Sequence, residues 1–100
     1  MQMMISDKPA KDTAGKWRPD LVPWKVVIAI ARVREYGEKK YGSADNWKKV
    51  ESKEYLNAMM RHLVARLRGE KIDPESGLPH SWHIACNIAF IVEREEYGHE

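Results

Sequence analysis

The fold of this chain is decided by residues 61–87, RHLVARLRGEKIDPESGLPHSWHIACN. Two segments with helical spacing lie on either side of the connector 69–77, which carries Glu70, Asp73 and Glu75. A purely structural helix hairpin needs only a short polar connector, and it has little use for acids flanked by histidines. We therefore expect two antiparallel helices whose connector presents a functional site.

The helix before the connector is expected to run from Ser52 to about residue 68. Ser52 suits the N-cap position, and Glu54 in the first turn complements the positive end of the helix dipole. Gly69 stands where a left-handed residue commonly ends a helix. The predicted buried stripe consists of Leu56, Met59, Leu63 and Leu67, with Met60 and Val64 beside it.

The helix after the connector begins at Pro79, because proline suits the first turn of a helix, and it extends into the charged run 93–96. A helix that is apolar on several sides lies at the centre of a fold or in a subunit interface. The expected apolar side chains are those of Trp82, Ala85, Ile88, Ala89 and Val92, widened by Ile84, Phe90 and Ile91.

The N-terminal part of the chain contributes another helix. Residues 17–24, WRPDLVPW, indicate an ordered strap, and Pro23 suits the first turn of a helix that continues to about residue 40. Gly42 ends this helix, and a short helical piece is expected at 47–50. The apolar stripe of the first helix is predicted to be Trp24, Val27, Ile28, Ala31 and Tyr36.

The predicted fold is an all-α helical bundle with a three-helix core and a short extra helix. One hundred residues form one domain, which we place at 17–97, after a flexible polar arm at 1–16. Because the apolar surface is wide for so few residues, we expect a homo-oligomer in which other copies complete the core.

The composition excludes several classes of protein. No apolar run approaches the roughly 20 residues of a membrane span, and no secretory signal is visible at the N-terminus. The net charge of +2 argues against nucleic acid as a partner. Cys86 is the single cysteine and suits a reducing compartment, so we expect a cytoplasmic protein.

The residues that suggest chemistry lie on both helices and on the connector. His80, His83 and Asn87 share one face of the later helix, and antiparallel pairing brings His62 near the middle of that face. Imidazoles with carboxylates suit a divalent transition ion, whereas carboxylates with water suit Mg²⁺ or Mn²⁺. The alternative is structural: the histidines are satisfied where they stand, and Asp73 only shapes a turn.

The cationic and aromatic residues nearby can each be interpreted as ligand-binding or as purely structural. A guanidinium or ammonium group matches phosphate oxygens but is equally at home in water, and a large aromatic ring stacks on a base or belongs to a core. Glu35 and Glu38 share one face, which suits magnesium or simply solvent. The candidates for phosphate are Lys39, Lys40, Arg61, Arg66 and Arg68, and those for a base are Tyr41, Trp47 and Trp82.

Five motifs occur in a characteristic order: WRPDLVPW at 17–24, EYGEKKYG at 35–42 with NW at 46–47, YLNAMMRH at 55–62, and GEKIDPESGLPHSWH at 69–83 with Asn87 downstream. From about residue 16 to 93 the chain thereby resembles small phage and prophage proteins of the dATP/dGTP diphosphohydrolase N-terminal family. That family is similar to the all-α nucleoside triphosphate pyrophosphatases (MazG-like). Those enzymes use divalent metal to cut between the α- and β-phosphates and are commonly oligomeric.

The resemblance implies metal-dependent hydrolysis of purine deoxynucleoside triphosphates, dATP or dGTP, to monophosphate and pyrophosphate. The alternative is a non-catalytic phage accessory module that binds nucleotide or a protein partner. One departure from the MazG-like pattern is the lack of its E-x-x-E and E-x-x-D pairs on the helix hairpin, so only positions in this family's own motifs are carried over. They are Glu70, Asp73 and Glu75 for catalysis; His62, Glu70, Asp73 and His83 for a divalent ion (Mg, Mn or another transition ion); and Lys40, Tyr41, Asn46, Trp47, Arg61, His80 and Asn87 for substrate.

Overall fold

Proline and glycine set the ends of the three helices in the computed structural model, which describes residue 12 and residues 14–95. Helix α1 spans Lys25–Tyr41, α2 spans Ser52–Leu67 and α3 spans His80–Arg94. α1 begins two residues after Pro23 and ends at Gly42, whose φ of 73° is left-handed. α3 begins directly after Pro79. The helix bounds agree with the predicted ones to within about two residues.

The all-α class is confirmed for the part of the chain that the structure describes. Two short 3-10 helices, η1 at Pro19–Leu21 and η2 at Asn46–Lys49, accompany the three α-helices. In place of a strand, the described residues show one antiparallel bridge, between Ile72 and Pro79 in the connector. None of the helices in residues 14–95 has the length and apolar character needed to cross a bilayer.

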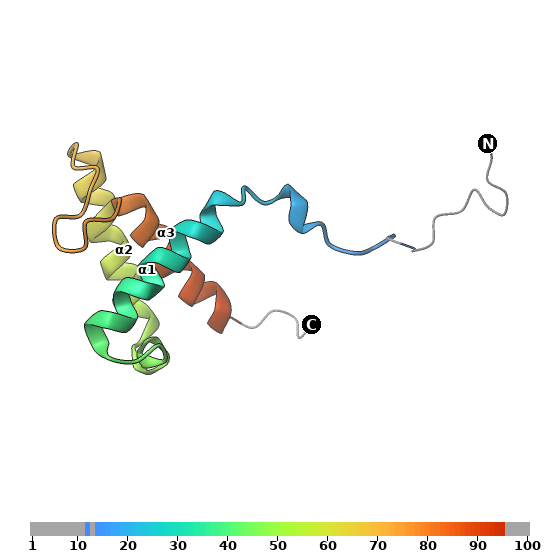
Figure 1. Cartoon of the computed structure of the whole chain (residues 1–100), viewed down its shortest axis with the longest axis horizontal. Helices are drawn as coiled ribbons and strands as arrows, with labels where there is room; N and C mark the ends of the chain where they lie inside the picture. The colour runs from blue at the N-terminus through green and yellow to red at the C-terminus, as the bar shows by residue number, and fades with distance from the viewer. Residues whose placement is uncertain (1–11, 13, 96–100) are drawn as a thin grey trace, which may run out of the picture.

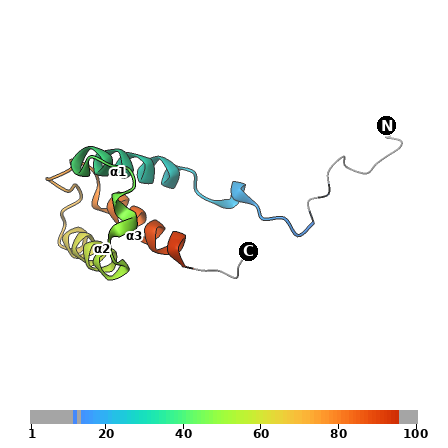
Figure 2. The ribbon, with the colours of Figure 1, turned by 90° about the horizontal axis from the view of Figure 1, so that it is seen from below.

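α3 is the central element of the bundle. Both α1 and α2 pack against it, while α1 and α2 scarcely touch each other. In Figure 2, α1 lies above α3 and α2 below it. The connector between α2 and α3 lies at the same end of the bundle as the C-terminal half of α1, which places its acids within reach of that helix (Figure 1).

The segment that precedes α1 runs away from the helices (Figures 1 and 2). η1 lies in this segment, where Arg18 and Asp20 form an exposed ion pair. Trp17 and Trp24 are 82% and 67% exposed, so the predicted strap does not cover the bundle. Of the predicted arm at 1–16, residues 1–11 and 13 lie outside the described residues, as do 96 and 97 of the predicted domain.

The predicted buried stripes are largely wrong. In α1 the buried residues are Ala29 and Val33, and in α2 the buried residue is Tyr55. On α1 and α2 most of the expected stripe therefore faces outward, whereas most of the apolar residues expected on α3 are half-buried. The expected stripe residues that are exposed are Trp24 just before α1, Val27, Ile28 and Ala31 on α1, and Leu56, Leu63 and Leu67 on α2, with Met60 and Val64 beside them. Of the apolar residues expected on α3, Ile88 and Val92 are exposed.

Ser52 does not cap α2 as predicted. Glu51 occupies the N-cap position, and Ser52 is the first helical residue. Its hydroxyl instead accepts a hydrogen bond from Arg94 Nη1 at 3.2 Å, and Arg94 Nη2 donates to the carbonyl oxygen of Trp47 at 2.7 Å. The C-terminal turn of α3 is thereby tied to η2 and to the start of α2.

An aromatic cluster lies at the same end of α3. The rings of Trp47 and Phe90 stack at 4.8 Å, and the Tyr55 hydroxyl donates to the carbonyl oxygen of Trp47. The guanidinium of Arg34 lies 5.2 Å from the Phe90 ring, and that of Arg94 lies 5.5 Å from the Trp47 ring. This cluster packs η2 and the start of α2 against the C-terminal half of α3, in addition to the direct contact between α2 and α3.

Candidate functional site

Asp73 organises the connector between α2 and α3. Its carboxylate accepts hydrogen bonds from the Ser76 hydroxyl at 2.8 Å and from the Ser76 amide at 3.2 Å, while its backbone amide bonds to Leu78 O. Gly77, at a φ of 76°, closes the turn, and its backbone N–H donates a hydrogen bond to the carbonyl oxygen of Asp73. Burial opposes ionisation of Asp73, but these hydrogen bonds outweigh it and lower the pKa of the carboxyl group.

Ser76 joins the connector to α3. Its oxygen lies 2.7 Å from His83 Nε2, and Asp73 Oδ2 lies 3.5 Å from the same nitrogen. A hydroxyl has one proton, and Ser76 donates it to Asp73, so Nε2 of His83 must be the donor to the Ser76 oxygen. His83 is 7% exposed, and this bond fixes its ring against the connector.

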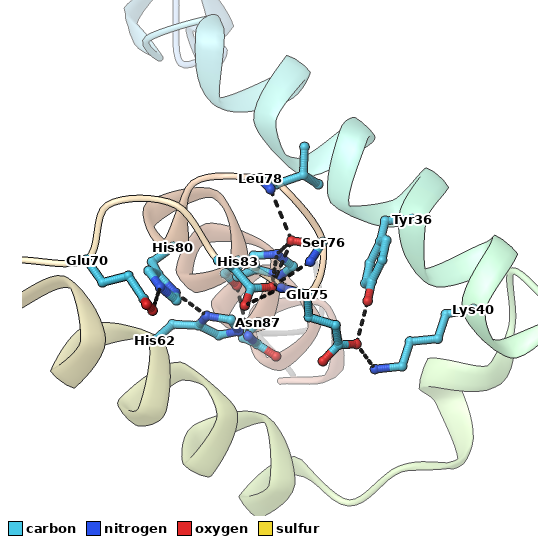
Figure 3. A network of polar contacts seen from close by, with 11 residues as sticks. Tyr36, Lys40, His62, Glu70, Glu75, Ser76, Leu78, His80, His83 and Asn87 are labelled. Carbon is cyan, nitrogen blue, oxygen red and sulfur yellow. Dashed lines mark hydrogen bonds and ion pairs between the residues drawn. The ribbon is translucent and has the colours of Figure 1, made fainter.

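His80 lies between two partners (Figure 3). Its Nε2 is 2.7 Å from a carboxylate oxygen of Glu70, and its Nδ1 is 2.8 Å from Nδ1 of His62. A neutral imidazole donates from one nitrogen, and the carboxylate requires that donor to be Nε2. When His80 is neutral, its Nδ1 accepts from Nδ1–H of His62, and Nε2 of His62 is then the unprotonated nitrogen.

His62 and His83 form a stacked pair. Their rings are 4.4 Å apart and inclined by only 5°. Burial lowers the pKa of His62, and the charge that His83 would carry lowers it further. Burial likewise lowers the pKa of His83, partly opposed by Asp73. Both imidazoles are therefore neutral at pH 7, as a proton acceptor must be.

Glu75 links the connector to α1. One of its carboxylate oxygens lies 2.5 Å from Lys40 Nζ and accepts a hydrogen bond from the Tyr36 hydroxyl. The Lys40 contact, followed by the Tyr36 contact, lowers the pKa of Glu75, and the same contact raises that of Lys40. The two charged side chains are 40% and 60% exposed, so this ion pair closes the connector onto α1 without burying either charge.

A pocket of about 570 Å³ is lined by residues of all three helices and of the segments that connect them. Its size is that of a site for a small organic ligand. One part of the wall is polar, with the imidazoles and the acids of the connector, and another part is apolar and aromatic. The residues of the polar part include Lys40, Arg61, His62, Asp73, Glu75, His80, His83 and Asn87, and those of the apolar part include Val33, Val50, Tyr55, Ala58, Cys86 and Phe90.

Comparison with known proteins gives two matches. The model of the family described as dATP/dGTP diphosphohydrolase, N-terminal, matches residues 6–100. The chain belongs to this family. A dATP/dGTP diphosphohydrolase of Salmonella phage PMBT28 is 35% identical over 77 residues, which are 77% of this chain and 26% of the relative. The chain thus spans about a quarter of the length of that protein. No solved structure matches the chain.

Every residue carried over from the family's motifs except Glu70 lines the pocket, whereas the other phosphate and base candidates, Lys39, Arg66, Arg68 and Trp82, do not. Glu70 contacts the site through His80, whose side chain it holds. Tyr41 and Trp47 line the pocket, although one face of the Trp47 ring is taken by Phe90. Glu35, by contrast, pairs with Arg32 at 2.9 Å on the exposed side of α1, and neither it nor Glu38 lines the pocket.

The four predicted metal ligands of the domain do not gather around one point. Glu70 pairs with His80, whereas Asp73 pairs with His83. Across residues 14–95, no group of three or more histidine, cysteine, aspartate or glutamate side chains is arranged to hold an ion. The arrangement therefore does not fit a closed transition-metal centre, which needs three or four protein ligands. Mg²⁺ needs only one or two carboxylates beside the phosphates of a substrate, and Asp73 and Glu75 on the pocket wall fit that role.

Two residues with a part in the site were missed in the sequence. Ser76 satisfies both Asp73 and His83, and Tyr36 holds Glu75. Ser76 lies inside the PESG turn, where a hydroxyl is expected to bond to the backbone, and nothing in the turn signals a bond to a histidine of α3. Tyr36 belongs to the EYGEKKYG motif, and its spacing of four from Lys40 was the signal that both face one partner.

Proposed function

We propose that the pocket binds a purine deoxynucleoside triphosphate as its magnesium complex, and that the chain hydrolyses it to the monophosphate and pyrophosphate. The observation that carries this proposal is the hydrogen-bonded chain Glu70–His80–His62, which ends at an imidazole of the pocket wall. The name of the phage relative supports the substrate class.

His62 acts as the general base. Water attacks the α-phosphorus, and the bond from this phosphorus to the oxygen bridging to the β-phosphate breaks, so pyrophosphate leaves. The attacking water gives its proton to Nε2 of His62. Glu70 stabilises the resulting imidazolium through His80, because positive charge delocalised toward His80 is met by the carboxylate.

Arg61 and Lys40 balance the charge of the triphosphate. Arg61 lines the pocket and makes no ion pair with a described residue, so its guanidinium is available to phosphate oxygens. Lys40 is held by Glu75, and a phosphate group competes with that carboxylate for it. Asp73 or Glu75 would supply a protein oxygen to a magnesium ion bound together with the nucleotide, and such an ion would neutralise part of the phosphate charge.

The test is to incubate the purified chain with each of the four deoxynucleoside triphosphates and Mg²⁺ or Mn²⁺, and to follow phosphorus NMR. We expect monophosphate and pyrophosphate from dATP or dGTP. His62→Gln should lower kcat by about 10²- to 10⁴-fold, Glu70→Gln should lower it less, and Asn57→Ala, on the exposed face of α2 away from the pocket, should leave it unchanged.

Two results would contradict the proposal at different points. A folded wild-type chain that releases no pyrophosphate from any of the four nucleotides removes the hydrolase function. A wild-type chain that turns over, with His62→Gln equally active, keeps the function and removes the base assigned to it.

A second function is favoured by the length of the phage relative. Because this chain spans 26% of that protein, the domain can serve as a nucleotide-binding module whose chemistry is supplied elsewhere. Binding without turnover is the mark of that function. Nucleotide at about 100 times its Kd would then stabilise the fold by about 2.7 kcal/mol, with no pyrophosphate released.

A further inference from the structure

Gly37 interrupts the middle of α1, where glycine is unfavourable. The helix runs unbroken from Lys25 to Tyr41, so Gly37 ends nothing and caps nothing. A glycine in a helix interior destabilises it by about 1 kcal/mol relative to alanine. Its φ is also not in the left-handed region, unlike that of Gly42, so the backbone gives no reason for it.

The packing of the protein gives no reason for Gly37 either. Apart from the adjacent residues and the backbone of α1 itself, a Cβ atom built at this position meets no atom within 4 Å. No neighbouring helix approaches closely enough to require the missing side chain. Gly37 nevertheless lines the pocket, one turn after the buried Val33 and one turn before Tyr41 on the same face of α1. The space that a side chain would occupy is therefore space in the pocket.

We propose that Gly37 is the place where the purine ring of the ligand lies against α1. This inference rests on the proposed function, and it adds the position of the base within the pocket. A ring over Gly37 contacts the bare backbone of the helix, and any side chain at 37 would hold the ring away by at least the thickness of a methyl group.

A phosphate group does not explain the glycine. In the interior of an α-helix each backbone N–H is already bonded to the carbonyl four residues earlier, so no free donor is offered to an anion, in contrast to a helix N-terminus. A flat ring needs no donor from the helix, only an unobstructed surface. The aromatic rings of Tyr36 and Tyr41 lie on either side of Gly37 in the chain, and both line the pocket.

The polar edges of a base have partners in the pocket as well. Asn87 donates its amide N–H to the carbonyl oxygen of His83, which leaves its side-chain oxygen as an acceptor. The side chain of Asn46 makes no hydrogen bond with a described residue. Two amides on the wall of the same pocket suit the ring nitrogens and the exocyclic group of a purine.

The experiment compares a ligand that has a base with one that has none. Binding of dATP, dGTP and inorganic triphosphate to the full chain is measured by calorimetry, in the presence of Mg²⁺, for wild type, Gly37→Ala and Gly37→Leu. Asn57→Ala is the matched control, because it also places a better helix former in a helix interior but outside the pocket. Thermal unfolding of all four proteins is recorded without ligand.

Gly37→Ala should fold more stably and bind nucleotide less well. We expect its thermal midpoint to rise by about 4–8 °C, as for a gain of about 1 kcal/mol in a domain of this size. Its affinity for dATP and dGTP should fall by about tenfold, and further for Gly37→Leu, while the affinity for inorganic triphosphate stays within about twofold. Asn57→Ala should be more stable with all affinities unchanged.

The possible failures are distinguishable. If the wild-type chain binds triphosphate and nucleotide, and Gly37→Ala binds both as wild type does, the position of the base is wrong and the proposed function stands. Equal loss for nucleotide and inorganic triphosphate also overturns it, since the glycine would then serve the phosphates. If the wild-type chain binds no nucleotide, the proposed function itself fails.

Discussion

His80 couples Glu70 to His62 because both of its ring nitrogens are hydrogen-bonded. It is 4% exposed, and it meets a carboxylate on one side and an imidazole on the other. The carboxylate of Glu70 fixes the tautomer of His80, and His80 fixes that of His62. A change at Glu70, which is outside the pocket wall, therefore alters a basic nitrogen inside it.

The same histidines make the stability of the fold depend on pH. The pKa values of His62 and His83 are lowered in the folded state, chiefly by burial, so the unfolded chain binds more protons around the ordinary histidine pKa of about 6.5. Stability contributed by the neutral rings is complete above that pH and is lost as the pH falls through the folded values. We expect the urea midpoint to fall steadily between about pH 7 and pH 5.

His62→Gln separates this effect from that of the carboxylates. The pKa of Asp73 is also lowered in the folded state, but its effect begins only as the pH approaches the ordinary aspartate range near 4. Between pH 7 and 5 the variant should therefore lose stability less steeply than wild type. A wild-type urea midpoint that is constant over this range would contradict the prediction.

At the level of elements, the ends of the helices were predictable and their orientations were not. Pro23, Gly42, Gly69 and Pro79 act locally, through backbone restrictions that the sequence states directly. α1 has apolar residues on more than one side, since both the series with Val27 and the series with Val33 have helical spacing. Only the polar contacts of the bundle decide between them. Lys40 and Tyr36 must reach Glu75, and this turns Val33 inward with them.

The residues that line the pocket were largely predictable, and the pairing of their side chains was not. Nearly all of the positions carried over from the family's motifs line one pocket. The partner of each imidazole depends on rotations of α2 and α3 by fractions of a turn, which spacing does not specify. The sequence therefore placed His62 and His83 in one ligand set with Glu70 and Asp73, whereas Glu70 pairs with His80.

The connector should depend on Asp73 for its conformation. Asp73→Ala removes the acceptor of hydrogen bonds from the Ser76 hydroxyl and from backbone amides of a partly buried turn. We expect a loss of about 1–3 kcal/mol in the free energy of unfolding, measured by urea denaturation. Hydrogen exchange should also become faster at the amides of Ser76 and Gly77.

Asp45→Ala is the control for this variant. Asp45 pairs with Lys48 at an exposed site, so its loss should change the free energy of unfolding by less than about 0.5 kcal/mol. If Asp73→Ala were as stable as wild type with unchanged hydrogen exchange, the connector would owe its shape to Pro74 and Gly77 alone.

At the scale of the whole molecule, the described residues have a small hydrophobic core, two buried histidines and many exposed large apolar side chains. Within residues 14–95, no large side chain is completely buried, and the hydrophobic core consists of Ala29, Val33, Tyr55 and Cys86. Burial in this small core raises the pKa of the Cys86 thiol to about 11. A monomer rarely exposes as many large apolar side chains to water as lie on the outside of α2 and along the strap. This surface supports the expected self-association, with a second copy of the chain as the partner.

We expect the purified chain to have a mass by light scattering that is a multiple of 11.6 kDa, and a thermal midpoint that rises with protein concentration.

The outer face of α2 is the place to test, because Met60 and Leu67 are 53% and 76% exposed and contribute little to the core of a single copy. The double variant Met60→Lys and Leu67→Lys should shift the mass toward one copy, since charge in an apolar interface is strongly unfavourable. Ser81→Lys with Glu95→Gln adds the same charge at exposed polar positions of the α3 region and should leave the mass unchanged. A wild-type chain of one-copy mass at every concentration would contradict self-association, and an unchanged mass in the α2 variant alone would move the interface to the strap or to α3.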